Sequence, residues 1–106
     1  MTQAGSEGDG PPPQFIGALS RELHIVNRKG LHARATAKFV QCVDRFDADV
    51  KVTRGDETVG GDSIMGILTL GAGPGSTITV SASGAEAREA LEALEALVSS
   101  RFGEDE

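Results

Sequence analysis

Two hydrophobic periods alternate along the chain, and this alternation restricts the possible folds more than any other feature. Apolar and polar residues alternate in four segments, which predicts strands with one buried face: 20–27, 48–53, 58–60 and 76–82. Apolar residues recur with helical spacing in three others: 31–46, 64–68 and 87–98. Strands that are apolar on one side form a mainly antiparallel sheet with helices over that side. The sequence therefore predicts a two-layer α+β sandwich in the order strand, helix, strand, strand, helix, strand, helix.

The same patterns predict which side chains fill the core. Only four residues are aromatic, all of them Phe, so Val, Ile, Leu and Ala must supply most of the buried volume. Cys42 lies in the apolar stripe of the first helix and is expected to be a buried, inert thiol. The inward residues expected from the strands are Leu23, Ile25, Val50, Val52, Ile78 and Val80. Those expected from the helices are Leu31, Ala35, Phe39, Cys42, Val43, Phe46, Ile64, Ile67, Leu68, Ala87, Ala90, Leu91, Leu94, Leu97 and Val98.

Several residues predict where the helices begin and end. Asp62 or Ser63 caps the second helix, and Gly71 closes it. The segment "SGAE" at 83–86 matches a capping box that opens the third helix.

Length and charge limit the organisation of the chain and its partners. We expect a flexible tail at 1–16, one domain at 17–102 and a loose acidic end at 103–106. The net charge of −6 argues against nucleic-acid binding, which needs a broad basic face. No signal peptide or membrane-spanning segment is visible, so the sequence predicts a cytoplasmic protein without membrane insertion.

The stretch "GLHARATAKFV" at 30–40 is unusual for the start of a helix, because basic side chains stand at its positive end. If His32 caps the helix, its ring stays neutral near pH 7 and keeps a nucleophilic nitrogen lone pair. A phosphoryl group on that nitrogen would face the free N–H groups of the first turn. Arg34 could add a charge-assisted fork to the phosphate oxygens. Arg28, Lys29 and Lys38 make the surroundings basic.

Other readings of His32 stay open at this point. It could be a surface histidine that falls near a cap by chance, with Arg34 solvated. A metal site is not indicated, because His24 is the only other histidine and no ligand spacing is present. A hydrolase would need a second catalytic group near His32. We therefore expect no metal and no cofactor.

Two motifs together resemble the HPr family, the histidine-containing phosphocarriers of the bacterial phosphoenolpyruvate-dependent phosphotransferase system. "GLHARATAKFV" is similar to the active-site segment of the family, and "DSIMGILTLG" at 62–71 is similar to its second-helix segment. The resemblance covers about 20–100 and implies an open-faced β-sandwich of four antiparallel strands and three helices. It departs from the family pattern at Asp62, where Lys is common, and at Ala35, where Pro is usual.

The resemblance implies a role for individual residues. His32 would carry the phosphoryl group on Nδ1, taken from enzyme I and passed to an enzyme IIA. The guanidinium of Arg34 would stabilise the phosphate, and so would the backbone N–H groups of Ala33, Arg34 and Ala35 in the first turn. Ser63 would match a serine that a dedicated kinase phosphorylates in some members. The residues that would dock partner proteins are Ala33, Ala37, Ile64, Met65, Leu68 and Thr69.

The leading hypothesis is thus a phosphohistidine relay protein rather than an independent enzyme. It would act in sugar transport or in the nitrogen-related regulatory branch, and the "SIMGILTL" segment and the absence of Pro at Ala35 favour the regulatory branch. The alternative from another class is a non-catalytic binding module that contacts a regulator through its second helix, with His32 incidental.

Overall fold

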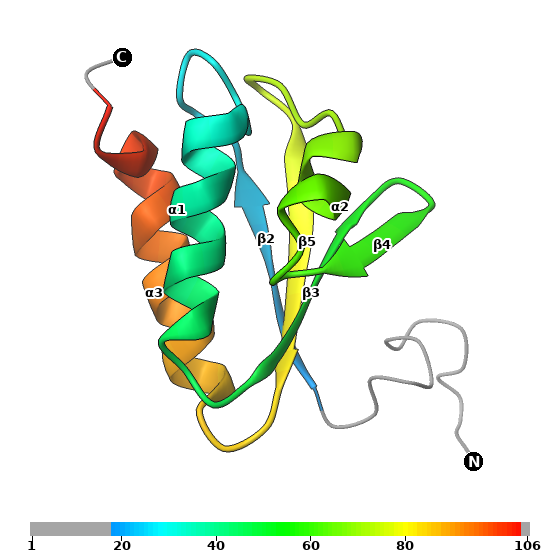
Figure 1. Cartoon of the computed structure of the whole chain (residues 1–106), viewed down its shortest axis with the longest axis vertical. Coiled ribbons are helices and arrows are strands. Elements are labelled where there is room, and N and C mark those ends of the chain that lie inside the picture. Colours follow the sequence, from blue (N-terminus) through cyan, green and yellow to red (C-terminus); the bar gives the residue numbers. More distant parts are fainter. Residues whose placement is uncertain (1–17, 105–106) are drawn as a thin grey trace.

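The computed structural model describes residues 18–104, so the tail predicted at 1–16 lies outside the described residues. Four strands and three helices follow one another in the predicted order (Figure 1). They are β2 (Leu19–His24), α1 (Ala33–Asp44), β3 (Asp49–Arg54), β4 (Glu57–Gly60), α2 (Ile64–Thr69), β5 (Thr77–Ser83) and α3 (Ala87–Ser99). A short 3-10 turn, η2 (Arg101–Gly103), follows α3.

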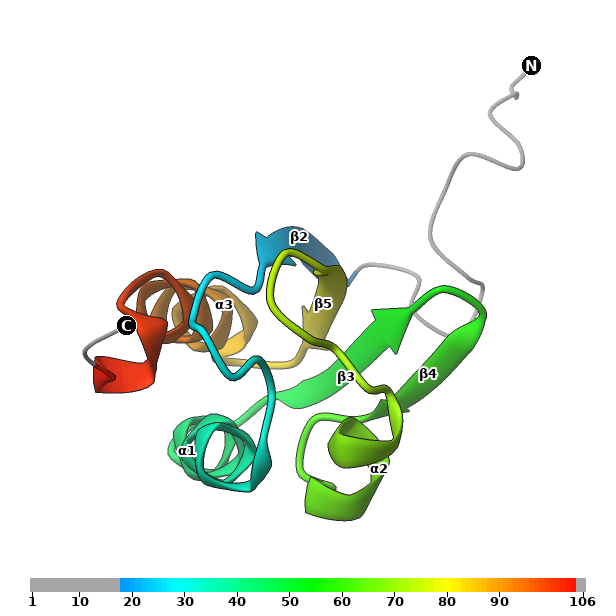
Figure 2. The same cartoon turned by 90° about the horizontal axis from the view of Figure 1, so that it is seen from above.

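The four strands form one antiparallel sheet in the order β2-β5-β3-β4. In Figure 2 the three helices lie together on one side of this sheet, which confirms the predicted two-layer sandwich. Leu23 pairs with Ile78, and Val52 pairs with Val80, so apolar residues meet on the covered face. The first strand ends earlier than the predicted range 20–27, because the ladder with β5 stops at His24.

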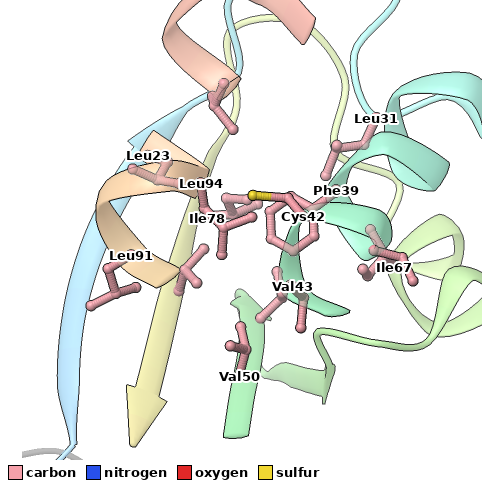
Figure 3. Packing of buried hydrophobic residues seen from close by; sticks show 14 of the residues in the cluster. Leu23, Leu31, Phe39, Cys42, Val43, Val50, Ile67, Ile78, Leu91 and Leu94 are labelled. Atoms are coloured by element: carbon pink, nitrogen blue, oxygen red, sulfur yellow. The ribbon is translucent and has the colours of Figure 1, made fainter. Parts of the chain in front are cut away.

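The core lies between the sheet and the helices, with Phe39 of α1 packed among residues of the strands and of α2 and α3 (Figure 3). The predicted inward residues of the strands are all buried, and so are most of those from α1 and α3. Phe46 and Leu97 are partly buried against the edge of the core. Cys42 is buried, and burial raises the pKa of its thiol.

The prediction for the inward face of the second helix was wrong at Ile64. This residue is 41% exposed, Leu68 is half-buried, and Ile67 is completely buried. The helix has only six residues, so a single position per turn reaches the core while its neighbours turn outward.

The predicted capping box at 83–86 was also wrong. Glu86, not Ser83, precedes the first helical residue of α3, and it makes no side-chain cap. Its carboxylate Oε1 accepts a hydrogen bond from the backbone N–H of Asp47 at 2.7 Å, and its own N–H donates to the Asp47 carbonyl at 2.9 Å. Glu86 therefore ties the start of α3 to the loop after α1.

Of the acidic end expected at 103–106, positions 105–106 lie outside the described residues, while Gly103 and Glu104 follow a segment that is held against the rest of the molecule. Phe102 is 1% exposed, and its backbone carbonyl accepts a hydrogen bond from Lys38 Nζ at 2.6 Å. The backbone N–H of Glu104 donates to the Arg101 carbonyl at 2.9 Å. The chain after α3 therefore folds back onto α1.

Gly30 fixes the path of the loop that enters α1. Its φ is +66°, and a Cβ there would lie 2.7 Å from the backbone oxygen of Ala72. The next N–H, of Leu31, donates to that same oxygen at 2.9 Å. Two loops distant in sequence can meet here only because the residue lacks a side chain.

We expect Gly30→Ala to destabilise the protein more than Gly55→Ala. Both glycines have positive φ, and alanine there costs about 1–2 kcal/mol. A Cβ at Gly55 has no neighbour within 4 Å, whereas one at Gly30 adds an overpacking cost of about 1–3 kcal/mol. Urea unfolding of both variants measures the difference, and equal free energies of unfolding would contradict the close approach.

Candidate functional site

His32 stands at the N-cap of α1, as predicted. Its backbone is extended, with φ −77° and ψ 179°, and its side chain makes no capping hydrogen bond. The carbonyl of His32 accepts the first bond of the helix, from Thr36 N–H at 2.8 Å. The N–H groups of Ala33, Arg34 and Ala35 precede that bond and so have no acceptor within the helix. The imidazole therefore stands beside the positive end of a helix.

The loop before His32 is rigidly attached to the rest of the molecule. Asn27 is fully buried, and its Nδ2 donates to the Gly30 carbonyl at 2.8 Å. Leu31 is buried in the core, and its N–H is bonded to Ala72. In Figure 1 this loop, the loop after α2 and the turn η2 lie at the same end of the molecule.

The structure brings to His32 a residue that the sequence did not indicate. Glu104 Oε2 lies 2.6 Å from His32 Nε2, with the two side chains 10% and 25% exposed. The carboxylate also accepts a hydrogen bond from Asn27 Nδ2, at 3.1 Å to Oε1. Glu104 is 72 positions from His32, and no local pattern predicts such a contact. The apolar Phe102 was the one signal that the end of the chain is held against the core.

The environment of Glu104 favours its charged form. The hydrogen bond from His32, and then that from Asn27, lowers the pKa of the Glu104 carboxyl below its ordinary value. An ionised carboxylate can only accept hydrogen bonds, so His32 Nε2 carries the proton that it donates. In the neutral ring the free lone pair then lies on Nδ1.

The basic residues predicted around His32 have different surroundings. The side chains of Arg28, Lys29 and Arg34 are exposed, and Arg34 is the second residue of α1. Lys38 is half-buried and is bonded to the carbonyl of Phe102. Three of the four are thus exposed near the positive end of the helix, and the fourth holds the end of the chain.

The predicted docking residues lie on two helices that pack against each other. Met65 is 71% exposed, Thr69 and Ala33 are exposed, and Ala37 is half-buried. Ile64, wrongly expected in the core, is exposed beside Met65, where the resemblance placed it. Figure 2 shows α1 and α2 adjacent in the helical layer.

Ser63 is the N-cap of α2, and its Oγ accepts a hydrogen bond from the Gly66 N–H at 3.0 Å. Of the two residues that the sequence offered as the cap, Ser63 and not Asp62 caps α2. Phosphorylation of Ser63 stays a prediction.

Comparisons with known proteins agree with this architecture. The family model described as "PTS HPr component phosphorylation site" matches residues 19–100. The phosphocarrier protein HPr of Cupriavidus necator is 47% identical over 83% of this chain and 99% of its own length. The phosphocarrier protein NPr of Shewanella violacea is 40% identical over 81% of this chain and 94% of its own. The crystal structure of HPr-C-His from Thermoanaerobacter tengcongensis has a TM-score of 0.80 and 39% identity, covering 83% and 99% of the two chains.

The fold and the site define a class of small α+β proteins that present a histidine at the cap of their first helix. The chain belongs to the HPr family, the phosphocarriers of the phosphotransferase system. None of the helices between residues 18 and 104 has the length and apolar character needed to cross a membrane.

The lowered pKa of Glu104 predicts a pH-dependent contribution to stability. Because the folded pKa lies below the ordinary value, the ionised carboxylate stabilises the fold above that value. The contribution is lost as the pH falls through the lowered pKa. The difference in free energy of unfolding between the wild type and Glu104→Gln should therefore shrink from about pH 7 to about pH 3. Urea unfolding at the two pH values measures it, and a constant difference would contradict the hydrogen bonds from His32 and Asn27 to the ionised carboxylate.

Proposed function

We propose that this chain accepts a phosphoryl group on Nδ1 of His32 from phosphorylated enzyme I and passes it to an enzyme IIA. One observation carries the proposal: His32 caps α1 beside backbone N–H groups that lack intrahelical acceptors. An empty helix start leaves those donors to water, whereas a phosphate beside the ring would accept hydrogen bonds from them. The membership of the chain in the HPr family supports the same function.

In the proposed transfer, each bond that forms to phosphorus replaces one that breaks. The Nδ1 lone pair of His32 forms the N–P bond while the bond from phosphorus to the donor breaks, and the donor leaves with its electron pair. The negative phosphoryl oxygens then face the N–H groups of Ala33, Arg34 and Ala35. The guanidinium of Arg34 adds charge-assisted hydrogen bonds. In the second transfer the acceptor attacks phosphorus, and the electron pair of the N–P bond returns to Nδ1.

The surface around Met65 supports docking of both partners. An exposed, unbranched and polarisable side chain adapts to different protein surfaces. Ile64, Thr69 and Ala33 are exposed as well, and the helices that carry them, α2 and α1, pack against each other. A donor or acceptor seated on it would reach His32 without rearrangement of the sheet. Such an exchange would take place in the cytoplasm, and phosphorylation of Ser63 by a serine kinase would change the charge of this surface.

The acceptor distinguishes a transport role from the regulatory role that the sequence favours. The protein, phosphorylated or unphosphorylated, is immobilised and incubated with a cell extract. The identity of the enzyme IIA that it retains then distinguishes the transport role from the regulatory role.

A second candidate function is a binding module that uses α2 without phosphoryl transfer. The observation that favours it is the exposure of Met65 together with Ile64 on one short helix. In that case His32→Ala would keep the function, while Met65→Asp or Leu68→Asp would abolish it.

Incubation with enzyme I and phosphoenolpyruvate should add one phosphoryl group, labile in acid and stable in alkali. His32→Ala should abolish the added mass, because it removes the nucleophile. His24→Ala is the matched control, since it removes the other histidine, which lies exposed on β2, and it should be phosphorylated like the wild type. Mass spectrometry measures the product. An unchanged mass of the wild type, or labelling that survives in His32→Ala, would defeat the proposal.

Met65→Asp should reduce kcat/KM for phosphorylation by enzyme I about tenfold or more, the loss typical of a truncated interface anchor. Leu19→Asp is the control, because Leu19 is also exposed and is the first residue of β2. In Figure 1 β2 begins at the end of the molecule opposite the start of α1. Equal rates for the two variants would show that α2 does not dock enzyme I.

A further inference from the structure

We propose that Glu104 is a positioning residue for His32: its carboxylate holds the imidazole in the Nε2–H tautomer and leaves Nδ1 free to take the phosphoryl group. The inference rests on the proposed phosphocarrier function and adds to it a residue from the other end of the chain.

The contact itself selects the tautomer. Glu104 Oε2 lies 2.6 Å from His32 Nε2, the short separation of a charge-assisted hydrogen bond. A neutral imidazole carries its proton on one nitrogen only, and an acceptor beside Nε2 favours the proton there. The lone pair is then on Nδ1 for most of the time. Without the carboxylate, the two tautomers would share the population.

Glu104 is itself held from the loop that carries His32. Asn27 Nδ2 donates to Oε1 at 3.1 Å and to the Gly30 carbonyl at 2.8 Å. Each carboxylate oxygen therefore has one donor, and both donors belong to the segment that leads into α1. Asn27 is fully buried, and among the described residues its Oδ1 has no partner, so its two donated bonds define its orientation. The angle of the imidazole is thus tied to the backbone before it.

The turn that places this carboxylate has an unfavourable backbone conformation. Arg101 and Phe102 have φ values of 59° and 57°, a left-handed conformation that is unfavourable for residues other than glycine. The buried ring of Phe102 and the bond from Lys38 Nζ to its carbonyl hold the turn in place. Backbone strain of this kind is concentrated at functional sites. Here the strained turn delivers Glu104 to His32.

The carboxylate also has a part in the charge balance of the transfer. When Nδ1 forms the N–P bond, the proton stays on Nε2 and the ring becomes positive. A carboxylate against the opposite nitrogen stabilises that charge, as it does for the histidine of a serine-hydrolase triad. When the acceptor removes the phosphoryl group, the electron pair returns to Nδ1 and the ring is neutral again.

The test uses the full chain as wild type, Glu104→Ala and Glu95→Ala. Glu95 is the matched control, because its carboxylate also accepts a short side-chain hydrogen bond, from Arg21 at 2.7 Å, but on the surface of α3. Nitrogen-15 NMR of the His32 ring above its titration range reports the tautomer. The kcat/KM for phosphorylation by enzyme I and phosphoenolpyruvate reports the transfer. Amide spectra of the same samples report whether the fold is intact.

We expect wild type and Glu95→Ala to show a protonated Nε2 and an unprotonated Nδ1, and to be phosphorylated at equal rates. Glu104→Ala should show averaged nitrogen shifts and a kcat/KM lower by about tenfold, the lower end of the range for removing the carboxylate partner of a metal-binding histidine. An unchanged tautomer in Glu104→Ala, or a changed tautomer with an unchanged rate, would overturn this inference alone. Failure of the wild type to take phosphate on His32 would instead overturn the proposed function.

Discussion

The structure depends on the burial of one face of the antiparallel sheet beneath the helices. Each strand carries apolar side chains on alternate positions, and the sheet would expose them all if α1 and α3 did not cover that face. Phe39, the largest side chain in the middle of the layer, meets strands and helices alike (Figure 3). Because α1 is fixed along its length by this packing, the position and direction of its first turn are fixed as well.

The candidate site exploits that rigidity at the end of the layers where loops meet. His32 is the N-cap of the helix. Because Gly30 has no side chain, the loop after α2 can contact the backbone beside it. The buried Asn27 donates a hydrogen bond to the Gly30 carbonyl within the loop. The side chains that would touch a partner are not part of the core, so they can vary in chemistry without cost to the fold. The molecule therefore separates the residues that hold the scaffold from those that give it a function.

Much of the architecture was predictable from periodicity. Local patterns predict the order of elements, the two layers, the buried faces of the strands and the cap at His32. They do so because the spacing of apolar residues over a few positions shows which face of a strand or helix is buried. The wrong predictions were made where a local sequence pattern was compatible with two different structural roles of one residue. Glu86 could cap α3, yet its carboxylate binds the N–H of Asp47, which no pattern near Glu86 reveals. Ile64 continued an apolar stripe, but a six-residue helix offers the core only Ile67.

The sequence by itself determined the fold class, the helix start at His32 and the presence of basic residues near it, since each depends on neighbours close along the chain. The family resemblance was likewise carried by two contiguous motifs. Only the tertiary structure decided which residue contacts the imidazole. Glu104 reaches His32 because the buried Phe102 and Lys38 fold the end of the chain back onto α1, and such a contact between distant residues is set by packing rather than by any local pattern.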